Sequence, residues 1–93
     1  MKTVWRFPFT VSDSVVIEMP VGASVLPTID ASRFEATLLF LWAEVDPDRD
    51  GPKEDRVFRV VRTGHELKHV GRYIGTARTA SRTAWHVYEG AEL

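Results

Sequence analysis

The regular alternation of short strand-like runs with turn residues is the feature that most constrains how this chain can fold. Runs rich in β-branched and aromatic residues follow one another, and clusters of Gly, Pro, Ser and Asp separate them along the sequence. Apolar residues within most runs recur at every second position, which is the period of a half-buried strand. The pattern predicts an all-β fold: a small antiparallel sandwich or partly open barrel of about six to seven strands, with at most one short helical turn.

The first two runs predict a hairpin. Residues 3–11, TVWRFPFTV, alternate as an edge strand, because Pro8 has no amide hydrogen to donate to a second neighbour. A polar turn at 12–14 leads to VVIEM at 15–19, and we expect these two strands to pair with each other.

An irregular third strand is expected next. The turn PVGA at 20–23 contains Gly22, which can adopt a positive φ. SVLPTI at 24–29 then forms a short strand that Pro27 interrupts. We interpret 30–36, DASRFEA, as a loop, because seven residues cannot sustain a helix without tertiary contacts.

The most apolar run lies in the middle of the chain. TLLFLWAEV at 37–45 is apolar on both faces, which predicts a central strand that is covered on both sides. After the polar connection 46–55, RVFRVVR at 56–62 resumes the strand pattern, and we expect these two runs to form the longest hairpin. Residues 72–77 and 83–89 predict a final antiparallel pair.

Length and composition exclude several classes of protein. A chain of 93 residues, 44% hydrophobic and 27% charged, predicts one globular domain over 1–93. No run contains the roughly 20 uncharged apolar residues of a membrane helix, and the N-terminal residues lack the pattern of a secretory signal, so we expect a cytoplasmic protein with no membrane partner. The absence of cysteine excludes disulfides, thiolate metal sites and thiol catalysis.

Charge is distributed unevenly along the chain. Residues 1–52 carry four basic and eight acidic side chains, whereas 53–86 carry eight basic and three acidic. Such asymmetry can mark a surface for nucleic acid or an acidic partner. The net charge of −1 favours the other interpretation, in which the two halves neutralise each other on a mixed surface.

A ligand site is expected, if anywhere, on the C-terminal strands. Their arginines could share one sheet face and bind phosphate groups, with Tyr73, Trp85 or Tyr88 as stacking surfaces. The alternative is a solvated outer face with salt bridges. The candidate ligand-binding residues are Arg59, Arg62, His65, Arg72, Tyr73 and His86.

Two motifs partly match metal sites, and neither matches fully. HELKH, from His65 to His69, has the spacing of a zinc protease, but that motif needs a helix of several turns, and Gly64 and Gly71 leave room for about one. DPDRDG at 46–51 starts like a calcium loop but lacks the glutamate at its twelfth position. With no nucleophile elbow or phosphate loop either, we expect no catalytic residue, no metal and no cofactor, and TGH at 63–65 is interpreted as a turn.

Six short motifs occur in order across almost the whole chain: KTVWRFP, EMPVGA, LWAEVDP, FRVVRTGH, YIGT and WHVYE. Together they resemble a family of short uncharacterised proteins encoded by bacteriophages and by phage-derived regions of bacterial genomes. The resemblance implies a small phage accessory protein, and it carries over no catalytic residue.

These observations lead to two hypotheses for function. The first is a non-enzymatic protein-interaction module that acts on a host or phage protein, or that assembles with itself through exposed sheet edges. The alternative is a nucleotide or phosphate-ligand binder that uses an arginine-rich sheet face. Nucleic acid is a less favoured partner, because the net charge is close to zero.

Overall fold

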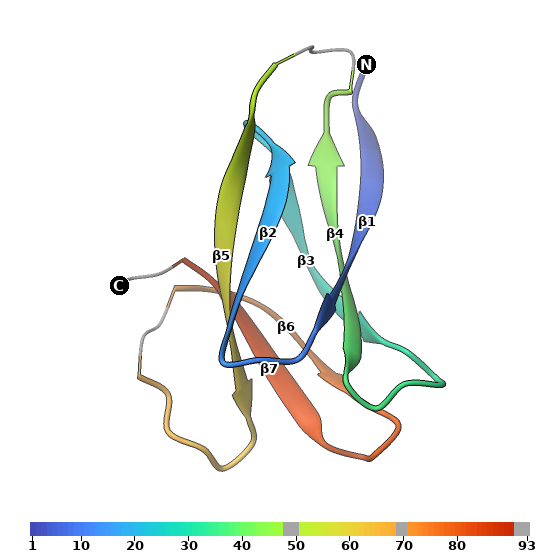
Figure 1. Cartoon of the computed structure of the whole chain (residues 1–93), viewed down its shortest axis with the longest axis vertical. Coiled ribbons are helices and arrows are strands. Elements are labelled where there is room, and N and C mark those ends of the chain that lie inside the picture. The colour runs from blue at the N-terminus through green and yellow to red at the C-terminus, as the bar shows by residue number, and fades with distance from the viewer. Residues whose placement is uncertain (48–50, 69–70, 91–93) are drawn as a thin grey trace.

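The computed structural model describes residues 1–47, 51–68 and 71–90 (Figure 1). Within these ranges the chain forms seven β-strands and no helix, and accordingly no helix that could cross a membrane. The strands are β1 (Thr3–Thr10), β2 (Ser14–Pro20), β3 (Ser24–Ala31), β4 (Leu38–Val45), β5 (Lys53–Arg62), β6 (Arg72–Arg78) and β7 (Ala84–Glu89).

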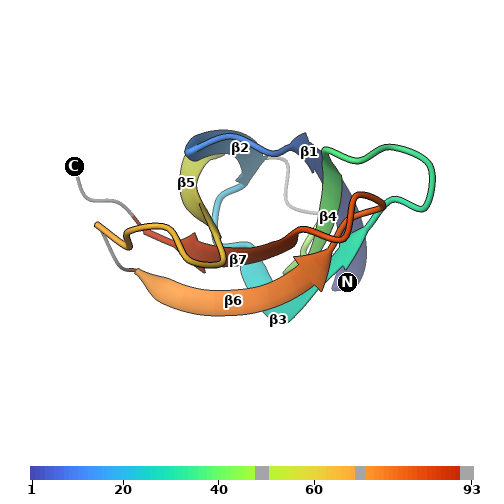
Figure 2. The ribbon, with the colours of Figure 1, turned by 90° about the horizontal axis from the view of Figure 1, so that it is seen from below.

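The strands form two antiparallel sheets that pack against each other (Figure 2). Sheet A has three strands in the order β1-β4-β3, and sheet B has four in the order β2-β5-β7-β6. Every pair of hydrogen-bonded strands is antiparallel. The prediction of an all-β antiparallel sandwich is therefore confirmed.

One continuous core lies between the sheets. In β4, Leu39, Leu41 and Ala43 have no exposed surface, and from sheet B the side chains of Phe58 and Val87 are equally buried. The alternation predicted for these strands places these side chains inward, because neighbours in a strand point to opposite faces.

The expectation that β4 is covered on both faces was wrong. Its second face, formed by Leu38, Phe40 and Trp42, is only half-buried, and it looks away from sheet B. The Arg6 guanidinium lies 4.5 Å from the centre of the Phe40 ring and covers part of this face. Apolar residues on both faces thus identified a central strand but not a second layer over it.

The predicted hairpin of β1 with β2 was also wrong. The connection between them turns the chain from sheet A into sheet B. The Val11 amide donates to Thr37 O beside β4, while Asp13 O accepts from the Val60 amide of β5. Because each strand needs a partner that continues its own sheet, β1 pairs with β4 and β2 pairs with β5.

The same correction applies to β4 and β5, which we expected to form the longest hairpin. They lie in different sheets, with β5 between β2 and β7. Strong strand signals on both sides of a polar connection predict two strands, but not that the two are partners. The hairpin of β6 with β7 was predicted correctly.

Several local predictions hold. β1 is an edge strand, Gly22 has a φ of 86°, and the pairing of β3 shifts register around Pro27. TGH is a turn, in which the His65 amide donates to Arg62 O and Gly64 has a φ of 90°. That φ suits the third position of a type II turn, which strongly favours glycine.

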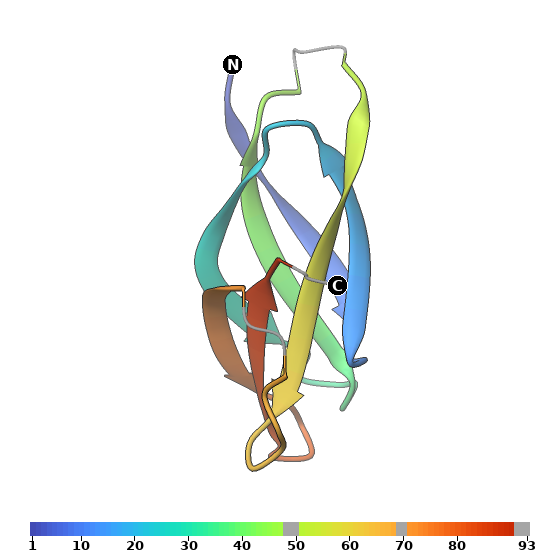
Figure 3. The ribbon, with the colours of Figure 1, turned by 90° about the vertical axis from the view of Figure 1, so that its left-hand side faces the viewer.

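The two sheets meet along β3 and β6, which lie side by side without pairing (Figures 2 and 3). A β-carbon on Gly75 would lie 3.1 Å from Ile29 N, so the glycine allows the two backbones to approach closely. This seam holds one side of the sandwich nearly closed.

Candidate functional site

The end of β5 leaves part of a strand edge open. β2 begins at Ser14, opposite Arg59, so the last three residues of β5 have a partner strand only on the β7 side. Figure 3 shows β5 continuing past the start of β2. On this side the Val60 amide already donates to Asp13 O, and Arg62 O accepts from the His65 amide. The other backbone groups of this edge can pair with another chain, so the edge is a potential binding element.

A groove of about 640 Å³ lies along this open edge. The β1–β2 turn contributes Asp13, and the segment after β5 contributes residues 65–68. The lining residues are Asp13, Arg59, Val60, Val61, Arg62, His65, Glu66, Lys68 and Trp85.

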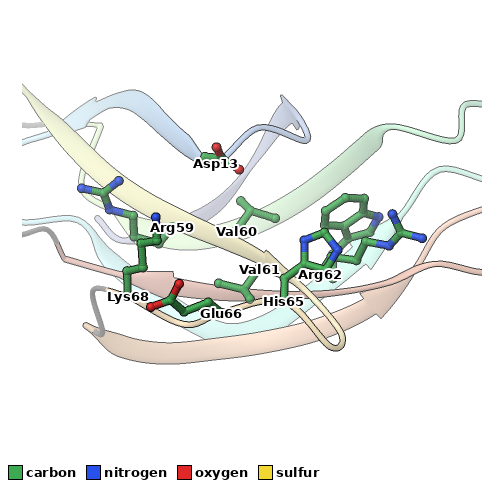
Figure 4. Close-up of a pocket in the computed structure, with 9 residues that line it drawn as sticks. Asp13, Arg59, Val60, Val61, Arg62, His65, Glu66 and Lys68 are labelled. Carbon is green, nitrogen blue, oxygen red and sulfur yellow. The ribbon is translucent and has the colours of Figure 1, made fainter.

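Cationic side chains stand at both ends of the groove. In Figure 4, Arg59 and Lys68 lie at one end, Arg62 and His65 lie at the other, and Val60 lies between them. The lining contains two carboxylates and three permanent cations, so the groove carries a net positive charge. The carboxylates are Asp13 and Glu66, and the cations are Arg59, Arg62 and Lys68. Its polarity suits a ligand that is anionic at its ends and apolar in the middle.

Two hydrogen-bond donors in the groove lining are unused. Arg59 Nε and Trp85 Nε1 are buried, and neither has a hydrogen-bond partner within the described ranges. An unsatisfied buried donor costs about 1–3 kcal/mol, so acceptor groups of a ligand would relieve a cost that the free protein carries.

Next to the groove, four side chains on the outer face of sheet B form a hydrogen-bonded chain. Thr63 Oγ1 lies 2.7 Å from His86 Nε2, and Thr76 Oγ1 lies 2.8 Å from His86 Nδ1. Tyr73 Oη extends the chain to Thr76 Oγ1. The ring of Tyr73 also packs at 5.4 Å and 60° against that of Tyr88.

Two opposite directions of donation satisfy this chain, one for each neutral tautomer of His86. In one of them, donation runs from Tyr73 towards Ala84 O. The Thr63 hydroxyl is 3.5 Å from Ala84 O, to which it can donate only weakly, while it accepts from His86 Nε2–H. His86 Nδ1 then accepts from Thr76, which accepts in turn from Tyr73. In either direction, both imidazole nitrogens of His86 have a threonine hydroxyl as partner.

The candidate ligand residues divide into three groups. Arg59, Arg62 and His65 line the groove, and His86 and Tyr73 belong to the adjoining hydrogen-bonded chain. A smaller pocket of about 250 Å³ between the two is lined by Val61, Arg62, Thr63, Gly64, His65, Leu67, His86 and Tyr88. The sixth candidate, Arg72, lies apart, where it donates to Glu89 Oε1 at 3.1 Å.

The arginines do not form the shared sheet face that the sequence suggested. Arg56 and Arg62 alternate with Arg59 along β5, so they point to the opposite side of the sheet. Arg56 is held by Glu89, at 2.6 Å, and by Ala23 O. Arg78 donates to Arg82 O within the β6–β7 turn. The expectation that these arginines come from neighbouring strands was also wrong, because β7 lies between β5 and β6.

The HELKH motif is not helical where it is described. His65, Glu66 and Leu67 follow the turn in an irregular segment, and His69 lies outside the described residues. Within the part of the chain that the structure describes, no three His, Asp or Glu side chains are grouped as a metal site would require.

Comparison with known families adds one finding. The model of a family described as a domain of unknown function, DUF7352, matches residues 1–93. The chain belongs to the DUF7352 family. Searches among curated proteins and among solved structures found no match. Membership in DUF7352 agrees with the coarse expectation of a family of uncharacterised proteins, and it assigns no activity.

Three motifs quoted for the resemblance meet in this DUF7352 fold. Thr63 comes from FRVVRTGH, Thr76 and Tyr73 from YIGT, and His86 from WHVYE. From the sequence, the two threonines were expected to be turn and packing residues and Trp85 a stacking surface, whereas Asp13 and Lys68 were not expected in the site. The sequence contained one signal for this chain of side chains, namely a Thr or a His in each of the three motifs. Their contacts depend on the strand register, which pairs Thr76 with His86.

Proposed function

We propose that this protein is a non-enzymatic protein-interaction module whose groove binds an extended acidic segment of a partner protein. The observation that carries the proposal is the coincidence of an open strand edge with cationic side chains and two unused donors. A segment laid along the edge would use main-chain hydrogen bonds for affinity, and its side chains for specificity.

The lining defines the segment. Val61, which is partly exposed between the cationic ends, offers an apolar contact, which suits apolar residues flanked on both sides by aspartate or glutamate. Carboxylates would reach Arg59 at one end and Arg62 at the other, and a carboxylate on Arg59 Nε forms a charge-assisted hydrogen bond. A carbonyl of the segment would accept from the indole of Trp85.

The test is a titration of the labelled protein with a capped peptide of two valines flanked by glutamates, followed by NMR. We expect shifts in the amides of Val60, Val61 and Arg62 and in the Trp85 indole N–H. Arg59→Gln should weaken binding about tenfold, as for loss of one charged hydrogen bond. Arg33→Gln, in an exposed loop outside the groove, is the control. Equal shifts with a lysine-flanked peptide would refute the proposal.

A phosphate-bearing ligand is the second candidate function. The tilted pair of Tyr73 and Tyr88, on the same side of sheet B as Arg59, favours it, because aromatic rings stack on nucleobases. In this case ADP or pyrophosphate, rather than the peptide, should raise the melting temperature of the protein. Tyr73→Leu should reduce the effect of ADP but not that of pyrophosphate, because only ADP has a base that stacks on the ring.

The biological setting follows from the resemblance rather than from the fold. We place the protein in the cytoplasm of a bacterial host, as a phage accessory protein that acts on a host or phage protein. Affinity purification from lysates of infected and uninfected bacteria, with Arg59→Gln as bait control, tests this. A partner captured equally by both baits would not be a groove partner.

A further inference from the structure

The smaller pocket beside the groove lies on the outer face of sheet B. Val61 of β5 pairs with His86 of β7, and opposed residues of an antiparallel pair share one side of the sheet. Tyr88, two residues after His86, lies on that side as well. Their strand neighbours Val60 and Val87 are buried in the core, so the side that the pocket occupies is the outer one.

The segment that follows β5 completes the smaller pocket. Gly64, His65 and Leu67 line it together with the residues of the two strands, and its volume is about 250 Å³. Leu67 is 41% exposed, so part of its side chain is free to contact a ligand. A cavity of about 150 Å³ is enough to hold benzene. The smaller pocket therefore has room for an aromatic ring.

The side chains of the lining also suit a ring. Val61 and Leu67 contribute aliphatic surface, whereas His65, His86 and Tyr88 contribute rings of their own. Both nitrogens of His86 have a threonine hydroxyl as partner, at 2.7 and 2.8 Å, so His86 needs no polar partner from a ligand. Aromatic side chains pack favourably against aliphatic groups and against other rings.

The smaller pocket adjoins the groove. Val61, Arg62 and His65 line both cavities. A segment paired with the open edge of β5 would lie about 5 Å from that strand. Its residue opposite Val61 would point to the outer face, and aromatic side chains are long enough to contact diagonal neighbours about 7–8 Å away. A ring on that residue would thus extend past Val61 into the smaller pocket.

We propose that the smaller pocket binds one aromatic side chain of the acidic segment that occupies the groove. This inference rests on the proposed function and adds a second determinant of specificity to it. Arg59 and Arg62 select the acidic residues at the two ends of the segment, and the smaller pocket selects phenylalanine or tyrosine between them. Because successive side chains of an extended segment point to opposite sides, only one of the two central positions can carry the ring.

The test compares three capped peptides by NMR titration of the labelled protein. The first is the peptide of two valines flanked by glutamates, and in the other two either the first or the second valine is replaced by phenylalanine. We expect one phenylalanine peptide to bind about tenfold more tightly than the valine peptide, because its ring becomes buried. The Leu67 methyl signals and the ring signals of His86 and Tyr88 should shift with that peptide alone. Equal affinity of both phenylalanine peptides would overturn the inference.

Leu67→Ala separates the two cavities, because Leu67 lines the smaller pocket and not the groove. We expect this variant to bind the tighter phenylalanine peptide about threefold more weakly than the wild type, with unchanged affinity for the valine peptide. Val21→Ala is the matched control: Val21 is 52% exposed in the turn between β2 and β3, outside both linings. A Leu67→Ala variant that binds all three peptides as the wild type does would contradict the proposal.

The outcomes distinguish this inference from the proposed function. If the valine peptide binds and Arg59→Gln weakens it, but neither phenylalanine peptide binds more tightly, the proposed function stands and the aromatic subsite is refuted. If none of the three peptides binds, both proposals fail.

Discussion

At the scale of single residues, glycines set how closely strands approach. Gly71 lies just before β6, directly against the end of β7. A β-carbon there would lie 1.8 Å from Glu89 O and 2.6 Å from Glu89 C. Both are backbone atoms, which cannot move aside as a flexible side chain can. The start of β6 is therefore compatible only with a residue that has no side chain.

Gly71→Ala should lower the free energy of unfolding by about 3 kcal/mol, because the clash displaces a backbone strand. Gly51→Ala is a matched control, since nothing lies within 4 Å of a β-carbon at Gly51. We expect the control to change the free energy of unfolding by less than about 1 kcal/mol. Urea titration of both variants, followed by tryptophan fluorescence, measures the difference; equal losses would contradict the steric explanation.

At the scale of elements, one carboxylate joins three strands and a turn. Glu89 of β7 accepts from Arg56 of β5 and from Arg72 of β6. Arg56 also donates to Ala23 O. Ala23 lies in the turn that connects β2 of sheet B to β3 of sheet A. The side chains of Arg56 and Glu89 are only 18% and 14% exposed, whereas that of Arg72 is 59% exposed.

The two arginines therefore should differ in their contribution to stability. Arg56→Met leaves a mostly buried carboxylate without its closest partner and should lower the free energy of unfolding by about 2–3 kcal/mol. Arg72→Met removes an exposed ion pair and should cost less than about 1 kcal/mol. Thermal and urea unfolding of both variants test this, and a larger loss in Arg72→Met would show that the burial argument fails.

The element scale also shows how far sequence patterns reach. The alternation of apolar and polar residues identified the strands, since each strand must bury one face. Pro8 identified β1 as an edge strand, because proline has no amide hydrogen to donate to a second neighbouring strand. The partners of β1 and β4 were not predictable in this way. A turn such as 11–13 looks the same whether the next strand pairs with the previous one or crosses to the other sheet.

At the scale of the whole molecule, the seam between β3 and β6 closes the sandwich. The pairing of both strands is irregular there, around Pro27 in β3 and around Ile74 in β6. Gly75 lies at the point of closest approach, with Ile29 and Thr28 opposite it. The distance between the two sheets along this edge therefore depends on the absence of a side chain at Gly75.

Substitution of Gly75 should reduce stability in proportion to side-chain size. Gly75→Ala should cost about 1 kcal/mol, because the Ile29 contact is tight but not impossible, and Gly75→Val about 3 kcal/mol. Thr28→Val, whose side chain is exposed on the facing strand, should stay within about 0.5 kcal/mol. Calorimetry of the three variants gives the series; a neutral Gly75→Val would mean that the seam is not closely packed.

The candidate site was predictable only as a set of residue types. Arg59, Arg62 and His65 were named from a basic, aromatic C-terminal segment, and they do line one groove. Arg72 was named for the same reason but pairs with Glu89 instead. Trp85 was expected as a stacking surface beside them, but Asp13 could not have been added, because it reaches the groove through a turn that is far from β5 in the chain.

The sequence by itself determined the strands, the edge position of β1, the glycine turns and the all-β class, since these depend on local alternation and on backbone restrictions. Only the tertiary structure decided which strands pair, which side of a sheet each arginine faces and where the groove lies. These features depend on how the open edges and apolar faces of seven strands are distributed between two sheets. That distribution is a property of the whole packed chain, and no single segment encodes it.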